Sequence, residues 1–113
     1  MDIQTKPVNT SPTLLEVQLH GRLDIQSSET VKVALHEAVK ISAGNVVVDL
    51  QNVNFIDSVG LSALVSGLRV AREKKKDLIL IGLKKQTTKV FELTMLNRIF
   101  LIYPNLDDLR ETI

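Results

Sequence analysis

The sequence predicts a small α/β fold, because apolar residues change their spacing from strand-like to helical along the chain. Residues 14–20 alternate between apolar and polar side chains, which is the period of a strand buried on one face. Residues 28–42 place apolar side chains three and four positions apart, as an amphipathic helix does. Residues 45–50 and 78–82 are short, nearly continuous apolar runs, which are typical of strands covered on both faces.

The predicted elements follow one another in the order β-β-α-β-α-β-α-β-α. The predicted strands are residues 14–20, 23–25, 45–50, 78–82 and 99–102, and the predicted helices are residues 28–42, a helix from 58, residues 86–96 and a short helix from 106. Strands that alternate with helices pair in parallel through right-handed crossovers, so we expect a mixed, mostly parallel sheet sandwiched with helices. The strand at 14–20 is expected at one side of this sheet, with one face open to water.

Residues with special backbone or capping preferences mark the ends of these elements. Gly21-Arg22 predicts a turn between the first two strands, and Gly44 is a favourable residue just past the end of the first helix. Asn105 is a favourable N-cap for the last helix. The inward face of the second helix is expected to consist of Leu61, Leu64, Val65, Leu68 and Ala71.

Length and composition fit one domain spanning residues 1–113. The mass is 12.6 kDa, and 44% hydrophobic with 24% charged residues suffice for a core and a hydrated surface. Without cysteine the chain has no disulfide, no thiolate catalysis and no sulfur-bound zinc. No apolar run reaches the roughly 20 residues of a membrane-spanning helix, and residues 1–7 do not resemble a secretion signal. We therefore expect a cytoplasmic protein away from membranes, with no metal and no cofactor.

The charge is distributed unevenly, with a basic run at residues 69–76. Residues 1–57 carry four Lys/Arg and seven Asp/Glu, whereas residues 58–113 carry ten and six. Clustered cations can bind phosphate backbones, but these lie where the second helix is expected to end and where cations complement its dipole. Aromatic side chains are not interleaved with them, as a stacking platform requires. We therefore expect no direct contact with nucleic acid.

Two connections are expected to meet at the carboxyl ends of the parallel strands, where α/β proteins bind ligands. One is Gly21–Asp24, and the other is Asn54–Leu61. Ser58 in the second connection stands at the helix start, with its hydroxyl near unpaired backbone N–H groups that favour a phosphate. Asp57 puts a carboxylate at the positive end of the helix dipole, and Gly60 leaves the first turn open to a partner's backbone.

Each of these residues also has a purely structural interpretation. Ser58 or Asp57 can serve as an N-cap, a role worth about 1 kcal/mol, and Asp24 can be a turn residue. As a nucleophile Ser58 would need a nearby base, but His20 and His36 are expected on a strand face and on the first helix. The sequence contains neither a G-x-S-x-G motif nor a Walker A motif. We therefore expect no catalytic residues.

Three motifs, in order along nearly the whole chain, resemble those of the STAS family, the anti-sigma-factor antagonists of bacterial partner-switching systems. Residues 53–61 resemble the family's phosphorylation loop with its D-S-x-G-L core, and residues 21–24 resemble its G-x-L-D turn. Residues 90–100 resemble its third helix and last strand. The family often has Gly where Met95 stands, and many members have a second Ser or Thr where Val59 stands.

The resemblance implies a STAS-like domain that acts as a switch and not as an enzyme. In that family the unphosphorylated domain binds an anti-sigma factor, a serine kinase with a histidine-kinase-like ATPase fold, and so releases a sigma factor. Phosphorylation of the serine that matches Ser58 ends binding, and a PP2C-type phosphatase reverses it. Asp24 and Asp57 are then expected to orient the kinase and the hydroxyl. Gly60 and Leu61 are expected in the docking surface.

Two other functions are compatible with the same residues. The chain could be a non-phosphorylated STAS scaffold or a transporter-associated STAS subunit, in which Ser58 is only a cap. It could instead be an enzyme that uses Ser58 as a nucleophile, which a fluorophosphonate probe would label. We expect the regulatory switch, because no membrane segment adjoins the domain in this sequence.

Overall fold

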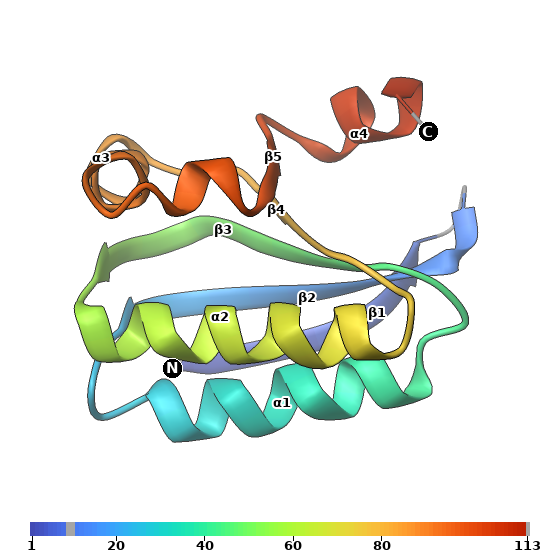
Figure 1. Ribbon diagram of the computed structural model, residues 1–113, viewed down its shortest axis with the longest axis horizontal. Coiled ribbons are helices and arrows are strands. Elements are labelled where there is room, and N and C mark those ends of the chain that lie inside the picture. The colour runs from blue at the N-terminus through green and yellow to red at the C-terminus, as the bar shows by residue number, and fades with distance from the viewer. Residues whose placement is uncertain (9–10, 113) are drawn as a thin grey trace.

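The strands form one sheet in the order β1-β2-β3-β4-β5, with helices on both sides (Figure 1). The computed structural model describes residues 1–8 and 11–112, with the backbone alone for residues 11–12 and 110–112. The strands are β1 (Asp2–Val8), β2 (Ser11–Leu23), β3 (Val46–Ile56), β4 (Leu78–Ile81) and β5 (Leu101–Tyr103). The helices are α1 (Ser28–Ile41), α2 (Ser58–Glu73), α3 (Lys85–Leu93), the 3-10 helix η1 (Leu96–Arg98) and α4 (Leu106–Thr112). Because β1 is antiparallel to β2 and the other neighbours are parallel, the predicted mixed, mostly parallel α/β fold is confirmed.

A large apolar core lies between the sheet and the helices α1 and α2 (Figure 1). Its buried side chains include Val17 from β2, Val48 from β3, and Leu35 and Leu64 from the two helices. A second, smaller core lies under α4, around the fully buried Leu109. The apolar runs at Val46–Val48 of β3 and Leu78–Ile81 of β4 supply both cores, as expected of strand segments covered on both faces.

The first two strands differ from the prediction, although the element order is the same. Residues 14–20 and 23 belong to the single strand β2, and Ile25 lies in the turn that follows it. Gly21 has a φ of +123° inside β2, where the pairing with β3 shifts register, so it forms an irregularity within a strand and not a turn. The true first strand is β1, whose mostly exposed side chains give no apolar alternation. β2 therefore lies between β1 and β3, and not at the side of the sheet.

β3 is longer than predicted and ends at Ile56, so only Asp57 separates it from α2. Residues 54–61, which were expected to be a connection, therefore comprise the end of β3, the single connecting residue Asp57 and the start of α2. Leu23 at the end of β2 pairs with Ile56, so the parallel ladder continues to this point. The start of α2 is thus held directly against the end of β2.

The predicted end of α1 and the predicted inner face of α2 each need a correction. Ser42 is the C-cap of α1 and has an extended backbone, so Gly44 is not the C′ residue of this helix. Val65 of α2 is 38% exposed and does not point into the core. The other four side chains expected on the inner face of α2 are buried, as predicted.

The end of α3 and the start of β5 are shifted from the prediction by three and two residues, whereas α4 begins at Leu106 as predicted. α3 ends at Leu93 and is followed by η1, which occupies the end of the predicted helix and shifts the start of β5 to Leu101. The predicted N-cap of α4 is confirmed, because the Asn105 side-chain oxygen Oδ1 accepts a hydrogen bond from the Asp108 N–H at 2.9 Å.

Met95, at the junction between α3 and η1, has a left-handed backbone with φ 61° and ψ 14°. This conformation costs a non-glycine residue about 1–2 kcal/mol, and a glycine adopts it freely. The side chain is 59% exposed and contributes little packing. We predict that Met95→Gly raises the free energy of unfolding by about 0.5–1 kcal/mol in urea denaturation, after allowance for the larger unfolded-state entropy of glycine. Met95→Ala keeps the strain, so an equal gain in that variant would contradict the backbone explanation.

Candidate functional site

The site predicted from the sequence lies at the carboxyl ends of β2 and β3, which are neighbours in the sheet. The end of β2 continues into a turn at residues 24–27, and the end of β3 continues into α2. The backbone N–H of Asp57 donates to the carbonyl oxygen of Leu23 at 3.2 Å, which joins the two segments. The two connections expected to converge therefore do so.

The carboxylate of Asp57 holds this junction together. Its Oδ1 accepts a hydrogen bond from the Gly60 N–H at 2.8 Å, which makes Asp57 the N-cap of α2. Its Oδ2 accepts a hydrogen bond from the Ile25 N–H at 3.2 Å, in the turn after β2. The capping role considered for Asp57 is therefore present, and the same side chain also bridges the two connections.

Ser58 is the first residue of α2, so it is not the N-cap. Its side chain is exposed, and its hydroxyl makes no hydrogen bond within the described part of the chain. The hydroxyl lies at the helix end that carries unpaired backbone N–H groups and the positive end of the dipole. An enzyme can therefore reach this oxygen, and a phosphate on it would be favourably placed.

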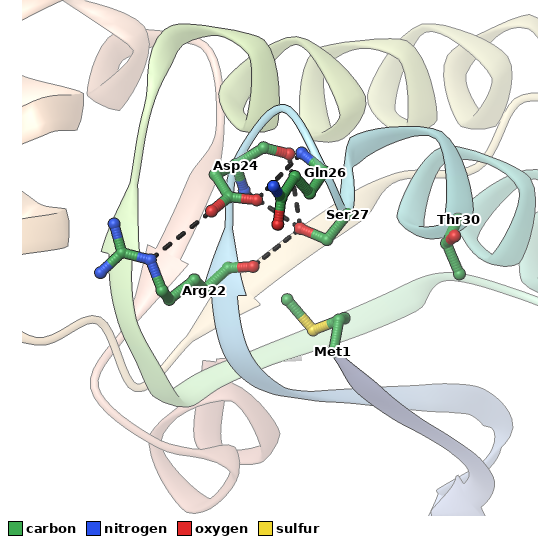
Figure 2. Close-up of a pocket in the computed structure, with 6 residues that line it drawn as sticks. All are labelled: Met1, Arg22, Asp24, Gln26, Ser27 and Thr30. Atoms are coloured by element: carbon green, nitrogen blue, oxygen red, sulfur yellow. Dashed lines mark hydrogen bonds and ion pairs between the residues drawn. The ribbon is translucent and has the colours of Figure 1, made fainter.

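Asp24 is engaged within its own turn (Figure 2). Its Oδ1 accepts from the Gln26 N–H at 3.0 Å, and its Oδ2 lies 3.5 Å from Nε of Arg22. The Ser27 hydroxyl donates to the Arg22 carbonyl at 2.7 Å and accepts from the Asp24 N–H at 3.0 Å. In the free domain Asp24 is therefore a turn residue, and its carboxylate already has two partners.

An open pocket of about 430 Å³ lies beside this turn (Figure 2). It is lined by Met1, Arg22, Asp24, Gln26, Ser27 and Thr30. The Asp24 carboxylate and the Ser27 hydroxyl, which line the pocket, are already bonded within the turn.

Gly60 and Leu61 are both buried, so neither forms part of the exposed surface in the free domain. A Cβ at Gly60 would overlap the carbonyl oxygen of Leu23. The absence of a side chain at Gly60 therefore lets α2 begin against the backbone of β2. Leu61 is 5% exposed and belongs to the large core. Both residues pack the first turn of α2 against the body of the domain and so fix the position of Ser58.

Neither histidine forms a base for Ser58. His36 on α1 has its Nε2 2.8 Å from the hydroxyl oxygen of Ser66 on α2, a contact that links the two helices. His20 on β2 has a buried Nε2 without a hydrogen-bond partner in the described structure. Among the described residues, no group of His, Asp and Glu is arranged to hold a metal ion. In the same residues, no helix is long and apolar enough to cross a membrane.

Three residues of the site were not singled out by sequence reasoning. Arg22 pairs with Asp24, and its guanidinium carbon lies 4.1 Å from the ring centre of Phe55 on β3. Ser27 closes the turn through its hydroxyl. Arg22 and Phe55 are opposite each other in the parallel pairing of β2 and β3. This pairing becomes visible only when the strand register is known.

Comparison with protein families matches residues 5–109 to the model of the STAS domain. The chain belongs to the STAS domain family. Its relatives include the anti-sigma-B factor antagonist of Listeria monocytogenes, which is 32% identical over 86 residues covering 75% of each chain. The anti-sigma-B factor antagonist of Staphylococcus aureus is 28% identical over 85 residues, 75% of this chain and 79% of the relative. This STAS domain is thus a member of the anti-sigma factor antagonist family, whose members are regulators and not enzymes.

Solved structures show the same STAS fold. The Thermotoga maritima protein TM1081 superposes with a TM-score of 0.87 at 20% identity, over 98% of this chain and 93% of that protein. The anti-sigma factor antagonist SpoIIAA in its unphosphorylated form gives a TM-score of 0.71 at 16% identity, over 98% and 96% of the chains. The phosphorylated form of SpoIIAA from Bacillus gives 0.72 at 17% identity, over 99% and 100%. These similarities confirm the predicted fold.

We predict that Gly60→Ala destabilises the domain by about 1–3 kcal/mol, because the new methyl group must push α2 away from β2. The matched control is Ser62→Ala, which changes an exposed residue of the same helix and is expected to cost less than about 0.5 kcal/mol. Thermal and urea unfolding measure both variants. Equal stability of the Gly60→Ala variant and the wild-type protein would show that the contact with Leu23 is not tight in solution.

Proposed function

We propose that this STAS domain is an anti-sigma factor antagonist whose unphosphorylated form binds an anti-sigma factor and so releases a sigma factor. Phosphorylation of Ser58 switches this binding off. The observation that carries the proposal is the exposed Ser58 hydroxyl at the start of α2, unbonded within the described structure. Two relatives are named antagonists of anti-sigma-B factor, and SpoIIAA has a phosphorylated form, which supports this assignment.

The free domain can accommodate a phosphate on Ser58. A phosphoserine carries about −1.5 to −2 charge at neutral pH, and the N-terminal end of α2 favours a negative group. The nearby carboxylates already have partners, since Asp57 accepts from two backbone N–H groups and Asp24 lies beside Arg22. The phosphate therefore adds charge without leaving either carboxylate unpaired.

The same phosphate is unfavourable for a partner that docks over Ser58. A surface that fits the neutral hydroxyl of Ser58 meets added bulk and two added charges next to Asp57. A loss of about 2–3 kcal/mol corresponds to binding that is about 30- to 150-fold weaker. Local repulsion at one side chain is therefore sufficient for a switch.

The remaining parts of the proposal follow the family. The anti-sigma factor acts as the serine kinase, with a histidine-kinase-like ATPase fold, and a PP2C-type phosphatase restores the hydroxyl. Asp24 and Asp57 orient the kinase and the hydroxyl, whereas Gly60 and Leu61 act by fixing α2 and not by touching the partner. Residues 1–113 act as one domain in the cytoplasm, with no direct contact to nucleic acid.

We predict that incubation with ATP, Mg²⁺ and the anti-sigma factor kinase of its partner-switching system adds one phosphate group per molecule. Intact-mass analysis measures the change. Ser58→Ala is expected to abolish it, and Ser62→Ala, which removes another exposed hydroxyl on α2, is expected to leave it unchanged. A phosphate that persists in Ser58→Ala, or an unmodified wild-type protein in the presence of active kinase, would contradict the proposal.

We predict that Ser58→Asp weakens binding to the anti-sigma factor by about 30- to 150-fold relative to the unphosphorylated wild-type domain. The substitution places a negative charge where the partner docks. Ser58→Ala removes only the hydroxyl and is expected to stay within about threefold of the wild-type affinity. Isothermal titration calorimetry measures both variants. Equal binding by Ser58→Asp would favour the alternative function, a STAS scaffold or transporter-associated subunit.

A further inference from the structure

The second half of α2 borders an apolar groove that the Ser58 site does not use. The groove has a volume of about 490 Å³ and is lined by Val65, Leu68, Arg69, Arg72, Glu73 and Ile99. Leu68 forms a buried floor, while Val65 is 38% and Ile99 47% exposed. Exposed apolar side chains therefore lie on both walls of the groove, above an apolar floor.

One wall of this groove is fixed by hydrogen bonding. Nη2 of Arg72 donates to the carbonyl oxygen of Ile99 at 2.8 Å, and its Nε lies 3.7 Å from Oδ1 of Asp77. Arg72 thereby ties the end of α2 to the segment after η1. The groove therefore exists before any partner arrives, which reduces the entropy cost of binding.

The groove borders the basic segment at residues 69–76. Of the charged residues that line the groove, Arg69 and Arg72 are cationic and Glu73 is anionic, and Arg72 is paired with Asp77. The exposed Lys74 and Lys75 follow in the sequence. Arg98 on η1, next to Ile99, is also exposed. An apolar floor beside a basic segment is complementary to apolar side chains flanked by carboxylates.

The groove is continuous with the Ser58 site along one face of α2. Val59, Ser62, Val65 and Arg69 are exposed and follow one another at spacings of three and four residues, so they share one side of the helix. At 1.5 Å per residue, Val65 lies about 10 Å along the helix axis from Ser58. A partner seated on Ser58 therefore reaches the groove.

We propose that this groove docks an acidic amphipathic helix of the partner that covers Ser58. The proposal rests on the proposed function only for the identity of the protein that carries the helix. Apolar side chains one turn apart on that helix contact Val65, Leu68 and Ile99, and its carboxylates face Arg69. Because the groove lies beyond the screening length of about 8 Å from Ser58, phosphorylation weakens the contact at Ser58 and leaves this one in place.

The test uses a defined probe, a 16-residue helical peptide with leucines at spacings of three and four and glutamates beside them. Amide chemical shifts of the ¹⁵N-labelled protein follow its titration. We expect shifts at residues 65–72 and 98–99, with at least tenfold weaker binding to Val65→Asp. Val33→Asp, which makes the same change at an exposed valine of α1, is the matched control and is expected to bind as the wild type does.

The same peptide with lysines in place of the glutamates is expected to bind at least tenfold more weakly. Equal binding of both peptides, or no shifts around Val65 and Ile99 at millimolar peptide, would overturn the proposal. Self-association that is lost in Val65→Asp would overturn it in favour of a second copy of this chain. Displacement of the acidic peptide by duplex DNA would overturn it in favour of a nucleic acid.

A second measurement separates this inference from the proposed function. Val65→Asp is expected to weaken anti-sigma factor binding by the same factor in the wild-type and Ser58→Asp backgrounds, since distant sites contribute additively. If Ser58 is phosphorylated but Val65→Asp binds normally, the groove proposal fails and the proposed function stands. If Ser58 is not modified and the acidic peptide still binds the groove, the proposed function fails alone.

Discussion

The Ser58 site depends on the carboxylate of Asp57, which accepts one hydrogen bond from the first turn of α2 and another from the turn after β2. These two backbone donors belong to segments far apart in the sequence, and the carboxylate brings them to a fixed separation. Gly60 allows α2 to begin close to the end of β2, because a side chain there would collide with Leu23. The geometry of Ser58 is therefore set by its immediate neighbours.

The two halves of α2 carry different kinds of surface. Its start presents a free hydroxyl beside carboxylates that are already bonded, so added negative charge changes what can dock there. Its end presents apolar side chains with cations around them. Because both regions lie on one helix, the proposed partner can contact both at once.

Much of the fold follows from side-chain periodicity, and the failures occur where periodicity carries no information. The start of α1, the strand β4 and the N-cap Asn105 agree with the prediction, because burial and capping leave clear patterns. β1 is an edge strand held by backbone hydrogen bonds to β2, so its exposed side chains show no pattern. Gly21 permits a turn and a strand irregularity equally well, and only pairing with β3 decides between them. The sequence likewise does not show that a side chain at Gly60 would collide with Leu23, because this contact depends on how α2 packs against β2.

The single residue between β3 and α2 has a consequence for how the domain works as a signal. With no slack in the chain at that point, a modification of Ser58 has no hinge or lid to move. Under the proposed function, phosphorylation therefore acts through charge and bulk at the surface and needs no movement of the backbone. The rates of the proposed kinase and phosphatase, and not a conformational step in this domain, then limit how fast the switch responds.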